Sequence, residues 1–132
     1  GWGLGGCMTT SLMLHHPGTL TTGVAGGSVT DWKYYEVMYT ERCMDSPKSK
    51  PEGYAKANLL DKVAQLDGSL LLIHGTVDDV VVWQHSLDFV KSCVDNGVQI
   101  DYFVYPGHPH NVVGKDRAHL MRKVLEYILA NN

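Results

Sequence analysis

Three short segments of this 132-residue chain contain the residue types of a hydrolytic centre that works through a nucleophile. They are residues 1–6, 71–79 and 105–110. The second and third supply an aspartate, Asp78, and a histidine, His110, in that chain order. In such a centre a histidine takes the proton of an attacking hydroxyl, and an aspartate orients the imidazole and stabilises its cation. The order predicts Asp78 as the orienting acid and His110 as the general base, with Asp79 capping the following turn.

The first segment, Gly-Trp-Gly-Leu-Gly-Gly, has the spacing of a G-x-S-x-G elbow. Such an elbow holds its serine on a tight turn between a strand and a helix. Here the serine position is occupied by Gly3. Cys7 does not replace the serine, because it lies about one helical turn further on and its side chain is predicted to point into the helix packing. The chain therefore has the plan of a serine hydrolase without the attacking atom.

Segments with strand and helix character alternate along the chain. The patterns predict strands over 21–25, 69–73 and 100–105, and helices over 5–16, 31–44, 54–58, 82–96 and 116–130, with a connector from 59 to 66. The run 69–73 is almost wholly apolar, which is typical of a parallel strand buried on both faces. The predicted fold class is α/β: the C-terminal part of an α/β-hydrolase fold, with a mainly parallel sheet flanked by helices, formed by residues 1–132 as one unit.

This topology places the three segments at one edge of the sheet. Ligands bind beyond the carboxyl ends of the strands in open parallel sheets. Asp78 follows the strand over 69–73, His110 follows the strand over 100–105, and the elbow would follow a strand upstream of Gly1. We therefore expect the chain to be a C-terminal fragment of a longer protein, with an unpaired strand edge that favours a homo-oligomer.

Composition and charge argue against several other functions. The formal net charge is −3, whereas a nucleic-acid-binding protein is expected to carry a basic stripe. The chain has no apolar run of the roughly 18–20 residues that span a membrane. His108 and His110 form an H-x-H pair, but no third ligand has suitable spacing, so we predict neither a metal site nor a cofactor. The widely spaced Cys7, Cys43 and Cys93 are predicted to be buried free thiols.

The whole chain also resembles a known family. The matching stretches are residues 5–10, 23–27, 31–42, 51–54, 71–75, 81–87 and 105–112. Together they resemble the C-terminal catalytic part of the prolyl oligopeptidase family of serine peptidases. The resemblance is greatest to its dipeptidyl peptidase IV branch, which includes bacterial prolyl tripeptidyl peptidases.

The resemblance implies a role for several positions. Gly3 stands at the place of the catalytic serine, Asp78 and His110 match the acid and base, and the backbone N–H of Leu4 matches a donor to the oxyanion. Val80 stands where mammalian relatives carry an asparagine that contacts substrate. The pocket that accepts a proline ring is matched by Val29, Trp32, Tyr35, Tyr39 and Val81.

By this resemblance the parent protein is a secreted or periplasmic serine exopeptidase. It would cleave peptides after a proline that precedes the scissile bond, releasing two or three residues from the amino terminus. The chain as written is expected to be inactive because Gly3 has no nucleophile. A natural pseudo-peptidase that binds peptides or acts as a scaffold is the alternative, and a natural or an engineered Gly3 fits the sequence equally well.

Overall fold

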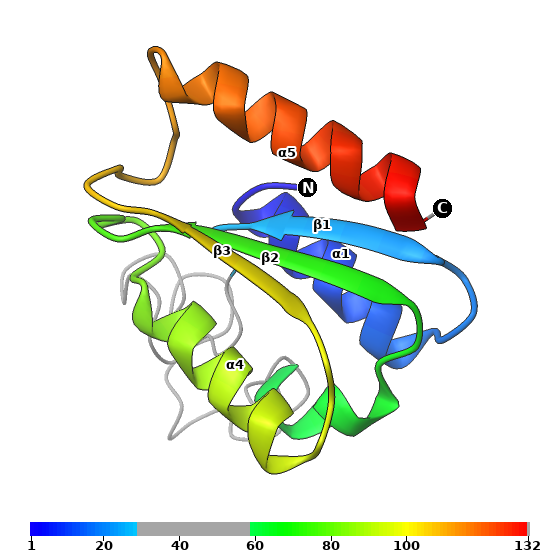
Figure 1. The fold of residues 1–132 in the computed structure, drawn as a ribbon. Helices are drawn as coiled ribbons and strands as arrows, with labels where there is room; N and C mark the ends of the chain where they lie inside the picture. The colour runs from blue at the N-terminus through cyan, green and yellow to red at the C-terminus, as the bar shows by residue number, and fades with distance from the viewer. Residues whose placement is uncertain (29–58, 132) are drawn as a thin grey trace.

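A three-stranded parallel sheet forms the centre of the molecule. The structure is a computed structural model that describes residues 1–28 and 59–131 (Figure 1). The strands are β1 (Thr22–Gly26), β2 (Ser69–Gly75) and β3 (Asp101–Tyr105), and they lie in the order β1-β2-β3. All pairings are parallel, with Val24 opposite Leu71 and Leu71 opposite Asp101. The carboxyl ends of the three strands therefore meet at one edge of the sheet.

Helices cover both faces of this sheet. Helices α1 (Leu4–His15) and α4 (Gln84–Asp95) lie on one face, and α5 (Asp116–Asn131) lies on the other (Figure 1). The central strand β2 supplies a core to each layer, because side chains alternate across a strand. Leu70 and Leu72 pack in the cluster with α1 and α4, whereas Leu71 and Ile73 pack in the cluster with α5. This double burial explains why the sequence of β2 is continuously apolar.

The predicted α/β fold with a parallel sheet is confirmed, and the elements differ from their predicted bounds only locally. The strand predicted over 69–73 continues to Gly75, and the helix predicted to start at 82 starts at Gln84. The connector expected over 59–66 was wrong in one respect, since residues Leu59–Gln65 form a 3-10 helix, η2. Ser92 Oγ of α4 donates a hydrogen bond to the Leu60 carbonyl in η2 at 2.7 Å. The helices predicted over 31–44 and 54–58 lie outside the described residues.

The start of the chain lies beside β1. Trp2 forms a parallel bridge with Gly26. The backbone N–H of Gly26 donates to the Gly1 carbonyl at 2.9 Å, and that of Gly3 donates to the Gly26 carbonyl at 2.8 Å. The outer edge of β1 is thus hydrogen-bonded at its carboxyl end, which corrects the expectation of a wholly unpaired edge.

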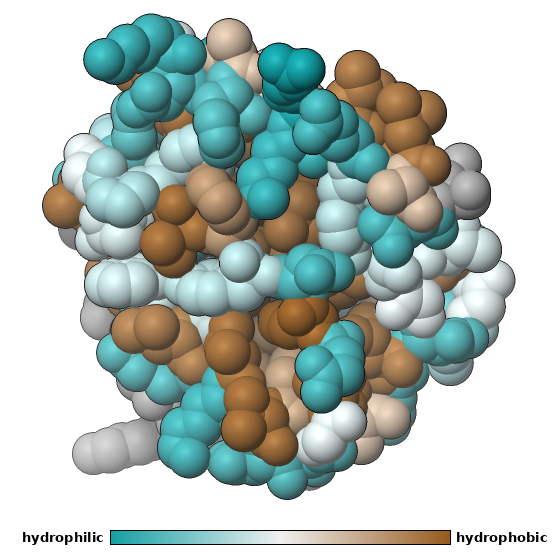
Figure 2. Space-filling model, viewed as in Figure 1, coloured by the Kyte–Doolittle hydropathy of each residue, from teal (hydrophilic) through white to brown (hydrophobic). Residues whose placement is uncertain are grey.

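Apolar side chains are exposed on α5. They include Met121, Leu125 and Leu129, and Figure 2 shows hydrophobic residues gathered over the C-terminal part of this helix. None of the described helices has the length and apolar character needed to cross a membrane.

Candidate active site

The elbow places Gly3 at the junction between the β1-paired segment and α1. Gly3 is the N-cap residue of α1 and has φ 57° and ψ −121°. This positive φ is readily adopted by glycine and is strained for a residue with a side chain. The Gly3 carbonyl accepts a hydrogen bond from the Cys7 N–H at 3.0 Å, which starts the helix. Leu4 is the first helical residue, and N–H groups in a first helical turn lack intrahelical acceptors.

Asp78 and His110 lie in the loops after β2 and β3 and are in direct contact. His110 Nδ1 and Asp78 Oδ2 are 2.7 Å apart, a distance at which the ring N–H donates to the carboxylate. The Asp78 side chain is fully buried, and the His110 side chain is 19% exposed. The imidazole is therefore fixed on its Nδ1 side and accessible from the other side.

The Asp78 carboxylate is held by several donors. Its Oδ1 accepts backbone hydrogen bonds from Val80 at 2.9 Å and Val81 at 2.8 Å. Burial alone would raise the pKa of Asp78, but hydrogen bonds from His74, His110 and Val81 lower this pKa overall. The expectation that Asp79 caps this turn was wrong, because the backbone donors of the turn bond to Asp78.

The other side of the His110 ring faces Gly3. A Cβ atom built on Gly3 would lie 2.9 Å from His110 Nε2, and one built on Gly27 would lie 2.9 Å from His110 Cε1. Real Cβ atoms essentially never approach a neighbour this closely, so Gly27 leaves room for the ring. His110 Nε2 thus faces the position where an elbow carries its nucleophile.

Trp2 links the elbow to the loop that carries the base. Its indole Nε1 donates a hydrogen bond to the His110 carbonyl at 2.6 Å. The indole lies on Gly26, where any Cβ would overlap the ring. Sequence reasoning missed this role of Trp2, although a tryptophan between the two glycines of the elbow was a visible signal.

A Trp2→Phe substitution is expected to loosen the His110 loop. Loss of the indole donor removes about 1 kcal/mol of local stabilisation, which corresponds to about fivefold faster hydrogen exchange of loop amides near His110. Trp83→Phe is the matched control, because Trp83 Nε1 donates to Tyr102 Oη at 2.6 Å, on a different contact. Equal exchange in the two variants would contradict a specific role for Trp2.

The remaining predicted site residues have different outcomes. Leu4 and Val80 are exposed, at 55% and 42%, whereas Val81 is 1% exposed and packs in the core with α1 and α4. The predicted place of Val81 in a proline pocket stays a prediction. The other predicted pocket residues lie outside the described part of the chain: Val29, Trp32, Tyr35 and Tyr39.

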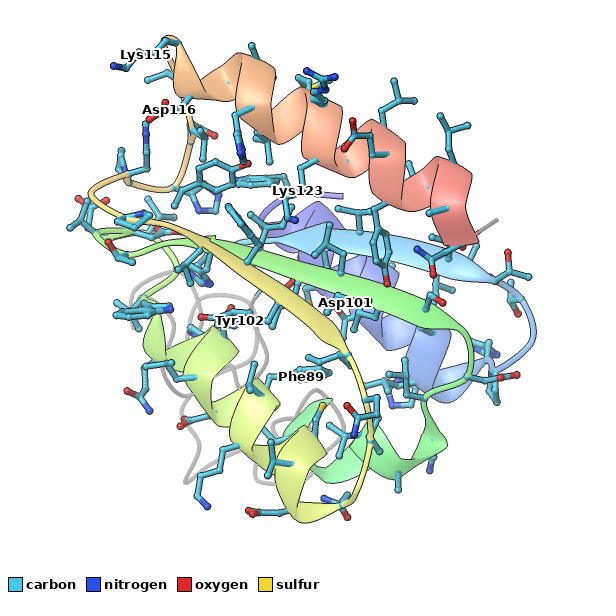
Figure 3. All side chains as sticks on the ribbon, in the orientation of Figure 1. Phe89, Asp101, Tyr102, Lys115, Asp116 and Lys123 are labelled. Atoms are coloured by element: carbon cyan, nitrogen blue, oxygen red, sulfur yellow. The ribbon has the colours of Figure 1, made fainter. Side chains whose placement is uncertain are left out.

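The two histidines of the H-x-H pair bind different carboxylates. His108 Nε2 lies 2.7 Å from Asp116 Oδ2, and Asp116 begins α5 above the loop that follows β3 (Figure 3). Within residues 1–28 and 59–131 no group of three His, Cys, Asp or Glu side chains is arranged to hold a metal ion.

Cys7 is not suited to replace the missing serine. The residue is 7% exposed, and burial raises the pKa of its thiol to about 11. Because the thiolate is the nucleophilic form, such a cysteine is unreactive at neutral pH. Cys93 is also a buried free thiol, and Cys43 lies outside the described residues.

A cavity of about 700 Å³ lies between β1 and α5. Its lining includes Gly1, Trp2, Val24 and Leu120, but not Gly3, Asp78 or His110. Gly3, Asp78 and His110 thus lie at the carboxyl edge of the sheet and outside this cavity.

A strand-to-helix elbow, an acid and a base on the carboxyl edge of a parallel sheet define the α/β-hydrolase class. The model of the prolyl oligopeptidase family matches residues 1–131. The chain belongs to the prolyl oligopeptidase family.

Named relatives agree with this assignment. A dipeptidyl-aminopeptidase B from Uncinocarpus reesii is 36% identical over 135 residues, which cover 99% of this chain and 15% of that protein. A crystal structure of a Bacteroides ovatus protein named as a dipeptidyl aminopeptidase IV has a TM-score of 0.99 and 53% identity. Porphyromonas gingivalis dipeptidyl peptidase 4 has a TM-score of 0.97 and 33% identity. Both structures match 100% of this chain, which spans 19% of each of theirs.

Proposed function

We propose that this chain supplies the acid and base of a serine exopeptidase that cleaves after proline, with a glycine in place of its nucleophile. The observation that carries the proposal is the Asp78–His110 pair, whose free imidazole nitrogen faces Gly3 in an intact elbow. The relatives named as dipeptidyl peptidases support an exopeptidase. Because the chain spans 15% of one such relative and 19% of the two solved structures, we propose that it is the C-terminal part of a longer peptidase.

The mechanism requires a hydroxyl at position 3. In the acylation step His110 Nε2 takes the proton of the hydroxyl, and the hydroxyl oxygen attacks the substrate carbonyl. The backbone N–H of Leu4 would donate to the oxyanion. His110 then protonates the leaving amine, and water hydrolyses the acyl-enzyme with His110 again as base. Asp78 holds the ring through Nδ1 in every step.

Proline specificity is assigned to Val29, Trp32, Tyr35, Tyr39 and Val81, and a further substrate contact to Val80. A flat aromatic slot suits a pyrrolidine ring, which is compact and apolar. This assignment rests on the family resemblance.

The substrate class is tested in the full-length protein with Gly3→Ser. We expect a Gly-Pro or Ala-Ala-Pro chromogenic substrate to be cleaved at least about tenfold faster, in kcat/KM, than its alanine counterpart, because the slot is fitted to the ring. Tyr35→Ala in the same background should remove most of this preference with little loss of stability. Equal cleavage of proline and alanine substrates would contradict the assignment.

A natural pseudo-peptidase is the second candidate function. It is favoured by the positive φ of Gly3, because glycine adopts this elbow conformation without the strain that a side chain would cause. This candidate predicts that the unmodified full-length protein binds a Gly-Pro peptide without cleaving it, as isothermal calorimetry and product analysis would show. An active Gly3→Ser protein indicates descent from a peptidase, and a folded but inactive one favours the binding role.

A further inference from the structure

His74 lies behind the Asp78–His110 pair and is completely buried. It is the penultimate residue of β2, the central strand of the sheet, and its exposed fraction is 0%. Its contacts connect three elements: β2 itself, the turn that carries Asp78, and helix α4.

Both ring nitrogens of His74 have partners that determine where its hydrogen lies. Nε2 is 2.6 Å from the Val81 carbonyl oxygen, and Nδ1 is 2.6 Å from Ser86 Oγ. A carbonyl only accepts, so Nε2 must carry the hydrogen. In the neutral ring Nδ1 then accepts from the Ser86 hydroxyl, which is also fully buried. The Val81 carbonyl thus selects the tautomer, and the Ser86 hydroxyl pairs with the other ring nitrogen.

The same nitrogen of His74 also lies close to the acid. His74 Nε2 lies 3.3 Å from Asp78 Oδ2, the oxygen to which His110 Nδ1 donates at 2.7 Å. Val81 closes the arrangement, because its N–H donates to Asp78 Oδ1 at 2.8 Å while its carbonyl accepts from His74. The side chains of His74 and Asp78 are both 0% exposed, so water does not substitute for these contacts.

We propose that His74 is a positioning residue for the catalytic acid: its Nε2–H, required by the Val81 carbonyl, fixes the Asp78 turn and aims Oδ2 at His110. The proposal rests on the proposed function for its catalytic consequence. The contact itself is independent of activity. Among the described residues the polar contacts of His74 are with Val81, Ser86 and Asp78, so His74 acts on the base through Asp78.

Two amide substitutions separate this role from simple packing. The amide nitrogen of glutamine reaches the position of Nε2, whereas that of asparagine reaches only the position of Nδ1. His74→Gln therefore keeps the donor toward Val81 and Asp78, and His74→Asn loses it. The readout is the His110 Nδ1 proton in the full-length protein with ¹⁵N-labelled histidine, assigned by the signal lost in His110→Gln.

We expect His74→Asn to speed exchange of this proton with water at least about tenfold, and His74→Gln to leave it near the parent rate. Ser86→Ala, a milder change, should shift the rate in the same direction as His74→Asn. With Gly3→Ser added, His74→Asn should lower kcat about 10- to 100-fold with little change in KM, since small misplacements of a catalytic group have effects of this size.

The proposal is overturned if folded His74→Asn, or Ser86→Ala where His74→Asn does not fold, retains the parent exchange rate. It is also overturned if the two amide variants change the rate equally, which is the result for a packing role. An inactive but folded Gly3→Ser protein would contradict the proposed function alone, because the exchange measurement decides the role of His74 without catalysis.

Discussion

Full-length protein with Gly3→Ser is expected to gain about 10⁴- to 10⁶-fold in kcat for a proline chromogenic substrate over the unmodified protein. Loss of the nucleophile in a serine triad lowers the rate by about this factor, because the residual rate comes only from binding and the oxyanion donors. The proposed base and acid are already in contact, with His110 Nδ1 2.7 Å from Asp78 Oδ2. Restoring the hydroxyl therefore completes a site whose other groups are placed.

Three controls accompany this measurement. Gly3→Ala adds a Cβ without a hydroxyl, and should fold like Gly3→Ser while remaining inactive. His110→Gln and Asp78→Asn, each combined with Gly3→Ser, should remove most of the gain. A gain that persists in the His110→Gln combination would show that this imidazole is not the base.

The new side chain also has a structural cost. The positive φ of Gly3 and the 2.9 Å approach of a Cβ to His110 Nε2 require a small movement of the imidazole. Backbone strain of this kind destabilises a protein by about 1–3 kcal/mol. Gly3→Ser and Gly3→Ala should therefore lower Tm equally, which separates the stability effect from the catalytic one.

Asp78→Ala is expected to destabilise the protein by about 3 kcal/mol, and Asp78→Asn by about 1–2 kcal/mol. Alanine leaves the backbone donors of Val80 and Val81 without the Asp78 carboxylate, whereas asparagine still offers an oxygen to them. Urea titration at pH 7 measures both values. Similar losses in the two variants would show that the charge of Asp78, rather than its hydrogen bonds to the backbone of the turn, accounts for the stability.

The stability from Asp78 also depends on pH. Its pKa is lowered in the folded state, so its contribution is fully present above the unfolded-state pKa of about 3.9 and disappears as pH falls through the lower folded-state value. The parent protein should therefore lose more stability than Asp78→Asn between about pH 5 and pH 2. Parallel loss in the two proteins would contradict the lowered pKa.

The sequence was sufficient to predict the parallel sheet, because its signals are local. The apolar run of β2 requires cover on both faces, and the alternation with helices leaves few other topologies. Asp78 and His110 follow successive parallel strands. Their places in the sequence therefore also predicted that both lie at the carboxyl edge of the sheet. These predictions needed only residue types and spacing.

Individual side-chain contacts between separate elements could not be predicted from the sequence. The Trp2 indole reaches a carbonyl 108 positions away, and His74 lies close to a carboxylate four positions away while it bonds Ser86 on the next helix. Neither contact leaves a periodic pattern in the sequence. The cap of the turn after β2 was misassigned for the same reason, since Asp78 and Asp79 are equivalent candidates until the loop conformation is known.

The bond from Trp2 to the His110 carbonyl has a consequence for the order in which the molecule assembles. It joins residues that are 108 positions apart, whereas Asp78 and His110 are 32 positions apart. Closing a longer loop loses more chain entropy, and contacts of large sequence separation slow folding. During folding, the contact between Asp78 and His110 is therefore expected to form before the contact between Trp2 and His110. The nascent sheet would first form a dyad, and the position of the nucleophile would be the last part of the centre to be completed.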